Sequence, residues 1–197
     1  PDGSGTAATF DYPFAIALNS DNTIAHILDG GSGFGARLKA RRLNLATLEV
    51  ITTYTSPTYM DFGHSVVTLS DTELLFTRNT QCTIEYLNLT TDIRTVIAGA
   101  SNTCAHQDGL GTAARLPSPT DIKLALDGQS AIFGDGNTVR SMSLAAPYTV
   151  TTLYGQPDEP GTIDGSLASA RFDSVFGLDL TADGSQMAVY QNGAIRT

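Results

Sequence analysis

Residues 95–155 read TVIAGASNTCAHQDGLGTAARLPSPTDIKLALDGQSAIFGDGNTVRSMSLAAPYTVTTLYG, and this stretch decides the fold. It holds, in order, a lead-in segment DGLGTAARL that starts at Asp108, a turn at Asp127 and two strand-like runs. Thr, Val, Ile and Tyr alternate with small or polar residues, and helical periodicity is lacking. The stretch therefore predicts one small antiparallel sheet.

The turn of this stretch recurs along the chain. Asp21, Asp71, Asp127 and Asp183 are separated by 50, 56 and 56 residues, and each follows a short apolar run. Asp, Asn and Gly at these places favour the left-handed backbone of hairpin loops. A period of this size is typical of stacked repeats.

The lead-in segment recurs three times, as DGSGTAATF from Asp2, DGLGTAARL from Asp108 and DGSLASARF from Asp164. Each has Ala six positions after the Asp and Phe or Leu eight positions after it. In extended backbone these two positions share a face, so both side chains are expected to enter one core layer.

Arginines also recur at fixed places in the repeat. Arg115 and Arg171 occupy one repeat position, and Arg140 and Arg196 occupy another. Recurrence predicts a structural role for them, such as pairing with the Asp of a lead-in segment.

The ordered pattern resembles the NHL-repeat family, whose blades carry Asp-Gly, Ala-Arg-Phe, Pro, an apolar strand, an Asp-Gly turn, Asn-x-Ile-Arg and a final Ala-Gly edge. The resemblance covers nearly all of the chain and implies an all-β, β-propeller-like array of about four blades. It implies one unit over residues 1–197, with repeats at approximately 1–53, 54–98, 99–154 and 155–197, the last incomplete. A closed ring, a fragment of a longer array and an open arc in two lobes all remain possible geometries.

Two repeats depart from the pattern. Repeat two has no lead-in segment, because 14 residues separate Ile51 from Ser65 whereas 25 separate Ile97 from Ile122. Repeat one carries an insertion at about residues 31–39. The first residue, inside one repeat, and the last, inside another, suggest an excerpt from a longer precursor.

The net charge of −9 and the pI near 4.5 weigh against nucleic-acid binding, which requires basic residues to neutralise phosphates. One basic cluster stands out, comprising Arg37, Lys39, Arg41 and Arg42. It is either a solvated loop or a contact for an anionic ligand. We expect the ligand surface to combine residues 31–42 with the loop 103–111, which adds His106 as a candidate.

Cys82 and Cys104 lack metal-knuckle spacing, and loops of adjacent blades could bring them together as a disulfide. The alternative is two unrelated buried thiols. Asn88-Leu89-Thr90 is an N-glycosylation acceptor if the protein is secreted. Together these features favour an extracellular location.

Evidence for catalysis is weak in the sequence. His26, His64 and His106 fall at different positions of the repeat, so a zinc site is disfavoured. GSGFGA at residues 31–36 lacks the βαβ context of a dinucleotide site, and the acids lack calcium-loop spacing. We expect no metal and no cofactor, and no stretch has the length of a membrane span.

The sequence thus predicts a non-catalytic binding or display module of a surface protein, such as a receptor or sensor ectodomain, with a protein, small-molecule or glycan ligand. Its length, acidity and irregular repeats also resemble ectodomains of insect-stage trypanosome surface antigens, which would imply an anchor outside this segment. The alternatives are a propeller enzyme, either a zinc-dependent lyase or a strictosidine-synthase-like protein, and an intracellular scaffold propeller.

Overall fold

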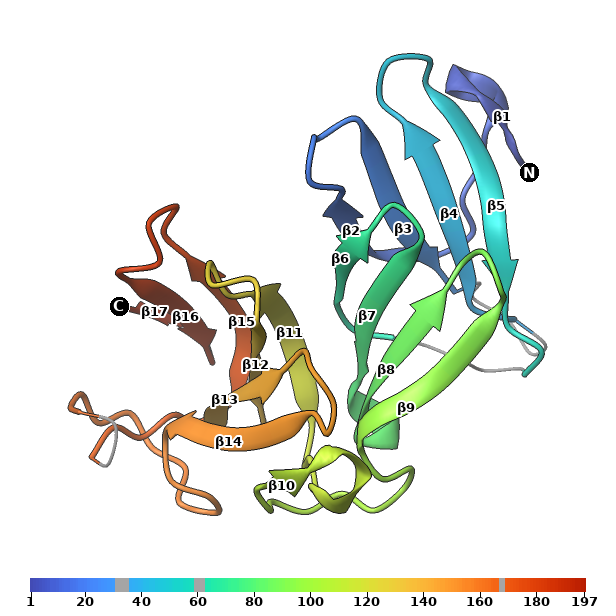
Figure 1. Cartoon of the computed structure of the whole chain (residues 1–197). Coiled ribbons are helices and arrows are strands. Elements are labelled where there is room, and N and C mark those ends of the chain that lie inside the picture. Colours follow the sequence, from blue (N-terminus) through green and yellow to red (C-terminus); the bar gives the residue numbers. More distant parts are fainter. Residues whose placement is uncertain (31–35, 59–62, 167–168) are drawn as a thin grey trace. The chain divides into compact units, whose positions relative to one another are not determined.

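The computed structural model describes residues 1–30, 36–58, 63–166 and 169–197. These residues form four small antiparallel sheets, one for each predicted repeat, and three single-turn 3₁₀ helices, η1 (Gly5–Ala7), η2 (Asn79–Gln81) and η3 (Gly111–Ala113) (Figure 1). The prediction of an all-β, β-propeller-like fold is confirmed. Each sheet is called a blade below.

Blades one and three share a five-stranded topology. Blade one contains β1 (Gly3–Ser4), β2 (Pro13–Leu18), β3 (Ile24–Asp29), β4 (Lys39–Asn44) and β5 (Glu49–Thr55). Blade three contains β10 (Gly109–Leu110), β11 (Pro119–Leu124), β12 (Ser130–Asp135), β13 (Thr138–Ser143) and β14 (Thr149–Tyr154). The strand orders are β1-β5-β4-β3-β2 and β10-β14-β13-β12-β11. Each lead-in segment therefore contributes a short strand, β1 or β10, beside the last strand of its blade, β5 or β14.

Blades two and four are smaller. Blade two contains β6 (Val66–Ser70), β7 (Glu73–Arg78), β8 (Thr83–Asn88) and β9 (Ile93–Gly99). Blade four contains β15 (Val175–Leu180), β16 (Met187–Gln191) and β17 (Ala194–Arg196). The trimmed second repeat is confirmed, because the described part of blade two has no lead-in strand. Of the predicted insertion at 31–39, residues 31–35 lie outside the described residues.

When the short lead-in strands β1 and β10 are left out of the numbering, all four predicted Asp turns connect the first two strands of a blade, namely β2 to β3, β6 to β7, β11 to β12 and β15 to β16. Asp21, Asp127 and Asp183 each accept a hydrogen bond from the backbone N–H two residues further on, at 2.8 to 3.1 Å. Asp71 instead accepts one from Asn19 Nδ2, at 2.9 Å. The bonds of Asp21, Asp127 and Asp183 stabilise their turns without a partner from elsewhere in the fold, whereas Asp71 has a partner in blade one.

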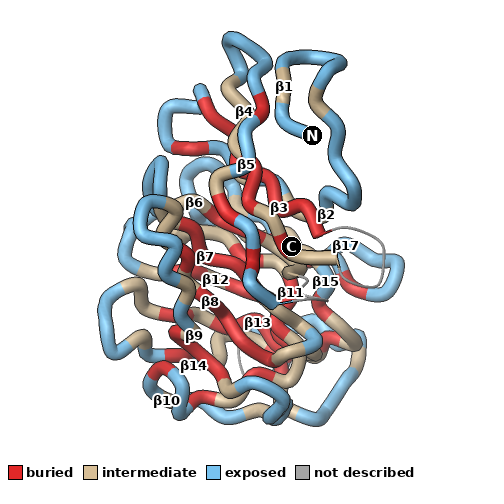
Figure 2. Tube along the Cα trace, turned by 90° about the vertical axis from the view of Figure 1, so that its right-hand side faces the viewer, coloured by how far each residue is buried: buried red, intermediate tan, exposed pale blue. Residues whose placement is uncertain are grey.

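The chain divides into two compact units, and the boundary passes through blade two. Unit one comprises Pro1–Phe76 and Tyr86–Thr95, and unit two comprises Thr77–Glu85 and Val96–Thr197. Within unit one β2 lies against β6, and within unit two β11 lies against β15. Figure 2 shows that the buried stretches follow the strands and the exposed stretches follow the turns.

Each unit has its own apolar core. In unit one the core residues are Leu28, Leu38, Ala40, Tyr54, Val66, Leu74, Phe76 and Leu87. In unit two one cluster joins blades three and four through Val139, Ala170, Phe172, Val175, Leu178 and Val189. Burial of apolar area at about 25 cal/mol per Å² is the main force that holds neighbouring blades together.

The paired apolar residues of the lead-in segments behave as predicted in two repeats. Ala114 and Leu116 are fully buried, and Ala170 and Phe172 are nearly so. The prediction is wrong for the first repeat, because Phe10 is 37% exposed. Its ring lies against the guanidinium of a buried arginine at 4.7 Å, so it covers that charge instead of filling the core.

Two glycines, Gly99 at the end of β9 and Gly155 directly after β14, stand where any other residue would be strained. Gly99 and Gly155 have φ of +81° and +88°. A Cβ at Gly99 would lie 2.2 Å from the carbonyl oxygen of Cys82, and one at Gly155 would lie 2.5 Å from that of Asn137. The glycine at the end of this edge of the repeat therefore reflects both the backbone conformation and the close approach of a neighbouring segment of the chain.

Candidate functional site

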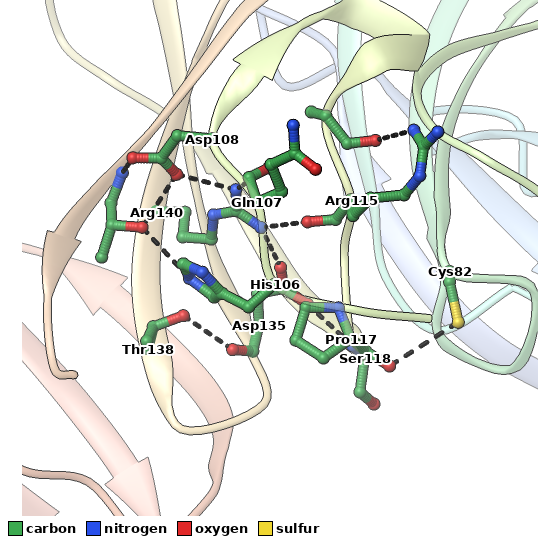
Figure 3. Close-up of polar contacts among 12 residues, drawn as sticks. Cys82, His106, Gln107, Asp108, Arg115, Pro117, Ser118, Asp135, Thr138 and Arg140 are labelled. Atoms are coloured by element: carbon green, nitrogen blue, oxygen red, sulfur yellow. Dashed lines mark hydrogen bonds and ion pairs between the residues drawn. The ribbon is translucent and has the colours of Figure 1, made fainter. Parts of the chain in front are cut away.

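A buried arginine fixes the lead-in segment of blade three (Figure 3). Arg140, on β13, is fully buried. It donates to Asp135 on the neighbouring strand at 2.6 Å and to Asp108 of the lead-in segment at 2.8 Å. The predicted pairing of this arginine with a lead-in Asp is confirmed. Arg196 pairs with Asp164 in the same way in blade four.

The same guanidinium also satisfies the backbone of the lead-in segment. Arg140 donates to the carbonyl oxygens of Gln107 at 2.9 Å and Arg115 at 2.7 Å, which stand on either side of the turn. Asp135 is also fully buried, and burial raises its pKa to about 6 although Arg140 acts in the opposite direction. The carboxylate and the guanidinium together hold the loop in one position.

Blade one repeats this arrangement with Arg41. Its guanidinium contacts Asp29 and Asp2, both at 3.1 Å, and the carbonyl oxygens of Pro1 and Thr9. Arg41 was a candidate ligand contact in the sequence, but it is only 2% exposed and its guanidinium holds the lead-in segment. The match of RRLNL at 41–45 to RSMSL at 140–144 is the sequence signal for this role.

The predicted disulfide is confirmed. Cys82 precedes β8, Cys104 lies in the loop before β10, and their Cα atoms are 5.3 Å apart across 22 residues of chain. Closing a loop of this length removes unfolded-state entropy worth about 3 kcal/mol in the chain-entropy treatment. The bond ties the start of the loop 103–111 to blade two, and Arg140 ties its end to blade three.

A cleft of about 520 Å³ lies beside this anchored loop and is open to solvent. It is lined by His106, Gln107, Asp108, Thr152, Leu153, Gly155, Gln156 and Pro157. The first three come from the lead-in loop, and the others come from β14 and the segment after it. The disulfide and Arg140 therefore hold the first wall, and strand β14 forms part of the second.

His106, Thr152 and Asp108 form a connected polar group in this cleft. His106 Nε2 lies 3.1 Å from Thr152 Oγ1, and that hydroxyl donates to Asp108 Oδ1 at 2.9 Å. The N–H of Thr152 donates to the other oxygen of Asp108 at 2.9 Å. Thr152 was not among the predicted site residues, and Asp108 was covered only as part of the loop 103–111.

Protonation in the cleft follows from these contacts. Burial lowers the pKa of His106, and the nearby charge of Arg140 lowers it further, so the imidazole is neutral near pH 7. Burial opposes ionisation of Asp108, but hydrogen bonds from Thr152 and Arg140 together lower the pKa of its carboxyl. The cleft thus presents a neutral imidazole beside an ionised carboxylate.

The lining suits a neutral ligand that carries hydroxyl groups. His106, Gln107 and Gln156 offer both donors and acceptors, and the side chain of Asp108 remains 45% exposed as an acceptor. No Lys or Arg is among the lining residues given above, and the guanidinium of Arg140 is occupied behind the lead-in loop. Such a site has little to attract an anion.

The other predicted ligand residues lie in unit one. Arg37 donates to the carbonyl oxygen of Ser56 at 3.1 Å, while Lys39 and Arg42 are half-buried on β4. The loop 103–111 belongs to unit two, so the combination of the two loops in one ligand surface stays a prediction. Among the described residues, no three His, Cys, Asp or Glu side chains gather as metal ligands.

Asn88, the predicted glycosylation site, ends β8. Its Oδ1 accepts hydrogen bonds from the N–H groups of Thr90 and Thr91, and its Nδ2 donates to the hydroxyl of Tyr86. The asparagine side chain therefore closes the turn to β9 in this structure. No helix in the described part of the chain has the length and hydrophobicity needed to span a membrane.

Comparison with known proteins shows the fold. No protein-family model and no curated protein sequence matches this chain. A structural genomics protein of unknown function from Bacteroides thetaiotaomicron VPI-5482 is similar over 93% of this chain and 46% of its own, with 19% identity and a TM-score of 0.78. An auxiliary nutrient binding protein from Bacteroides ovatus ATCC 8483 matches 92% of this chain and 57% of its own, with 14% identity and a TM-score of 0.68.

A chain of a nidogen/laminin complex is also similar, over 91% of this chain and 56% of its own, with 13% identity and a TM-score of 0.62. The present chain thus spans about half the length of these structures. At such low identity the likeness supports a β-propeller-like fold. The finer assignment to NHL repeats stays a prediction.

Proposed function

We propose that this protein is an extracellular, non-catalytic binding module of a surface protein and that the cleft beside His106 takes a small neutral ligand rich in hydroxyl groups, such as a sugar. The observation that carries this proposal is the polar group of His106, Thr152 and Asp108, held open to solvent between a disulfide and a buried ion pair. A preorganised cleft lowers the entropic cost of binding.

Two further observations support the proposal. Disulfides persist mainly in oxidising compartments, so the bond between Cys82 and Cys104 favours a location outside the cytoplasm. One similar structure is described as an auxiliary nutrient binding protein. Arg37, Lys39 and Arg42 remain candidates for contact with an anionic partner, and Asn88 remains a candidate for glycosylation.

Calorimetric titration with glucose, galactose, mannose and N-acetylglucosamine, and with short oligosaccharides of each, tests the binding site. We expect saturable binding of at least one sugar, and we expect His106→Ala to weaken it about tenfold because a hydrogen-bonding group is lost. Gln129→Ala is the matched control, since this exposed residue lies outside the cleft and should leave affinity unchanged. Absence of binding across the panel, or equal affinity in both variants, would refute the proposed ligand class.

A further inference from the structure

One threonine of the cleft determines which ring nitrogen of His106 carries the proton. The ionised carboxylate of Asp108 can only accept hydrogen bonds, and it accepts from the hydroxyl of Thr152 at 2.9 Å. A hydroxyl has a single proton, so Thr152 Oγ1 is left as an acceptor toward His106 Nε2, which lies 3.1 Å away. In the neutral imidazole Nε2 therefore carries the proton, and Nδ1 is left with a free lone pair.

The direction of the threonine hydroxyl is a property of the blade and does not depend on a ligand. Thr52 of blade one donates its N–H to Asp2 at 2.9 Å and its O–H at 2.7 Å. Thr152 donates the same two groups to Asp108, at 2.9 Å each. In both blades a buried arginine contacts the same aspartate. The hydroxyl proton of Thr152 is therefore committed to the carboxylate before a ligand arrives.

The free lone pair of Nδ1 is available in the cleft. His106 lines the cleft, and in the described part of the chain its hydrogen bond is the one through Nε2. The ring nitrogens of His26 are enclosed in the interior without partners, whereas Nδ1 of His106 is not among the enclosed atoms. A ligand in the cleft can therefore reach Nδ1, and it meets an acceptor there.

We propose that His106 Nδ1 accepts a hydrogen bond from a ligand hydroxyl and that Thr152 positions the imidazole for this contact. The inference rests on the proposed function, because it concerns the same cleft and the same class of ligand. It narrows that class, since the contact requires a hydroxyl that donates. An ether oxygen or a fluorine at this place would face a lone pair and leave Nδ1 unsatisfied.

The arrangement also predicts how selectivity depends on pH. A hydroxyl can donate to the neutral imidazole or accept from the protonated one, whereas the fluorine of a deoxyfluoro sugar can only accept. Burial lowers the pKa of His106, and Arg140 lowers it further, while Asp108, Asp158 and the backbone of His106 act in the opposite direction. The preference for a hydroxyl should therefore be complete at pH 7.5 and disappear only below the usual histidine pKa of about 6.5.

Calorimetric titration tests this selectivity with the tightest-binding sugar among glucose, galactose, mannose and N-acetylglucosamine, and with its monodeoxyfluoro analogues. At pH 7.5 we expect one analogue to bind about tenfold more weakly than its parent sugar. This ratio should approach one as the pH falls through the folded pKa of His106. The ratio is informative because protonation of Asp135, whose pKa is about 6, would affect both sugars alike. In His106→Gln the ratio should not change with pH, because the amide does not titrate.

Nuclear magnetic resonance tests the role of Thr152 without a ligand. Long-range proton–nitrogen spectra distinguish a protonated ring nitrogen from a bare one, and the signals of His106 are those that His106→Gln removes. At pH 7.5 we expect a protonated Nε2 and a bare Nδ1 in the unmodified protein and in Thr152→Ser, and a mixture of tautomers in Thr152→Val. Thr52→Val is the matched control, since it removes the same hydroxyl from Asp2 outside the cleft.

Sugar affinity should follow the tautomer, so Thr152→Val should weaken binding whereas Thr152→Ser and Thr52→Val should not. A bare Nε2 at pH 7.5, a sugar ratio that does not change with pH, or equal affinity in Thr152→Val and Thr52→Val would overturn the proposal while sugar binding itself stands. Absence of binding by all four sugars would refute the proposed function, and the role of Nδ1 with it. A circular dichroism spectrum identical to that of the unmodified protein verifies the folding of each variant.

Discussion

Blades two and three carry a buried ion pair at the same place but with opposite polarity. In blade three the acid, Asp135, ends the second strand, and Arg140 is the third residue of the third strand. In blade two Arg78 ends the second strand, and Glu85 is the third residue of the third strand, with a distance of 3.1 Å between their charged atoms. The pair is thus kept in both blades although its order is reversed, whereas in blade four the corresponding strand ends at Gln191.

The lead-in segment explains the difference. Arg140 donates to Asp108 and to two carbonyl oxygens of the lead-in segment, which a carboxylate at that position could not do. The described part of blade two has no lead-in strand, and a carboxylate stands at the position of Arg140. Glu85 instead accepts from Arg78 and from the hydroxyl of Thr83, at 3.1 Å each. We therefore infer that the lead-in segment determines which of the two strands carries the acid and which carries the arginine.

Breaking the pair in blade three should have the largest effect. Arg140→Met leaves Asp135 buried without its cation and removes the donors of the lead-in segment, so we expect a loss of about 3–5 kcal/mol in the free energy of unfolding. Urea unfolding followed by circular dichroism measures it. Arg115→Met is the control, since Arg115 contacts only nearby carbonyl oxygens, and it should change stability by about 0.5 kcal/mol or less. Similar losses in the two variants would show that Arg140 is not the anchor.

The blades were predictable from the sequence, whereas only one wall of the cleft, in the loop 103–111, was. Turns at Asp21, Asp127 and Asp183 are stabilised by bonds to residues two positions away, so local sequence suffices to find them. His106 and Thr152 are 46 residues apart and meet only because β14 pairs with the lead-in strand. Sequence can identify such a meeting only after the strand register is known.

The role of Arg41 was obscured for a different reason. The insertion before β4 places Arg41 in a run of basic residues, which suggested a ligand contact, although its strand position is that of Arg140. Aligning the strands outward from Leu43 and Met142 removes the ambiguity. Composition alone does not distinguish a buried arginine from a solvent-facing one, whereas the position in the repeat does.

Reversing both charges sharpens the comparison between the blades. The double variant Arg78→Glu/Glu85→Arg keeps the pair of blade two, so we expect it to lose only about 1 kcal/mol. Asp135→Arg/Arg140→Asp should lose about 3–5 kcal/mol, because the new aspartate would face Asp108 and the carbonyl oxygens of the lead-in segment. Urea unfolding of both proteins at pH 7 measures the difference. Equal losses would mean that the lead-in segment does not determine the polarity.

The smallest effect concerns His26, which stands in blade one where blade three has Ile132. His26 is fully buried, and its two ring nitrogens lack hydrogen-bond partners among the described residues. Burial lowers the pKa of His26, and Arg42 lowers it further, while Asp71 acts in the opposite direction. His26→Ile should therefore stabilise the protein by about 1 kcal/mol at pH 7.5, because it removes unsatisfied polar atoms from the interior.

The variant should also change the response to acid. Because the folded pKa of His26 lies below the unfolded value of about 6.5, the unfolded chain binds a proton more readily as the pH falls below 6.5. The unmodified protein then loses stability, and His26→Ile lacks this contribution, so its advantage in urea unfolding should be larger at pH 5.5 than at pH 7.5. An advantage that stays constant between these pH values would mean that His26 is protonated equally in both states and that blade one tolerates a buried imidazolium between Arg42 and Asp71.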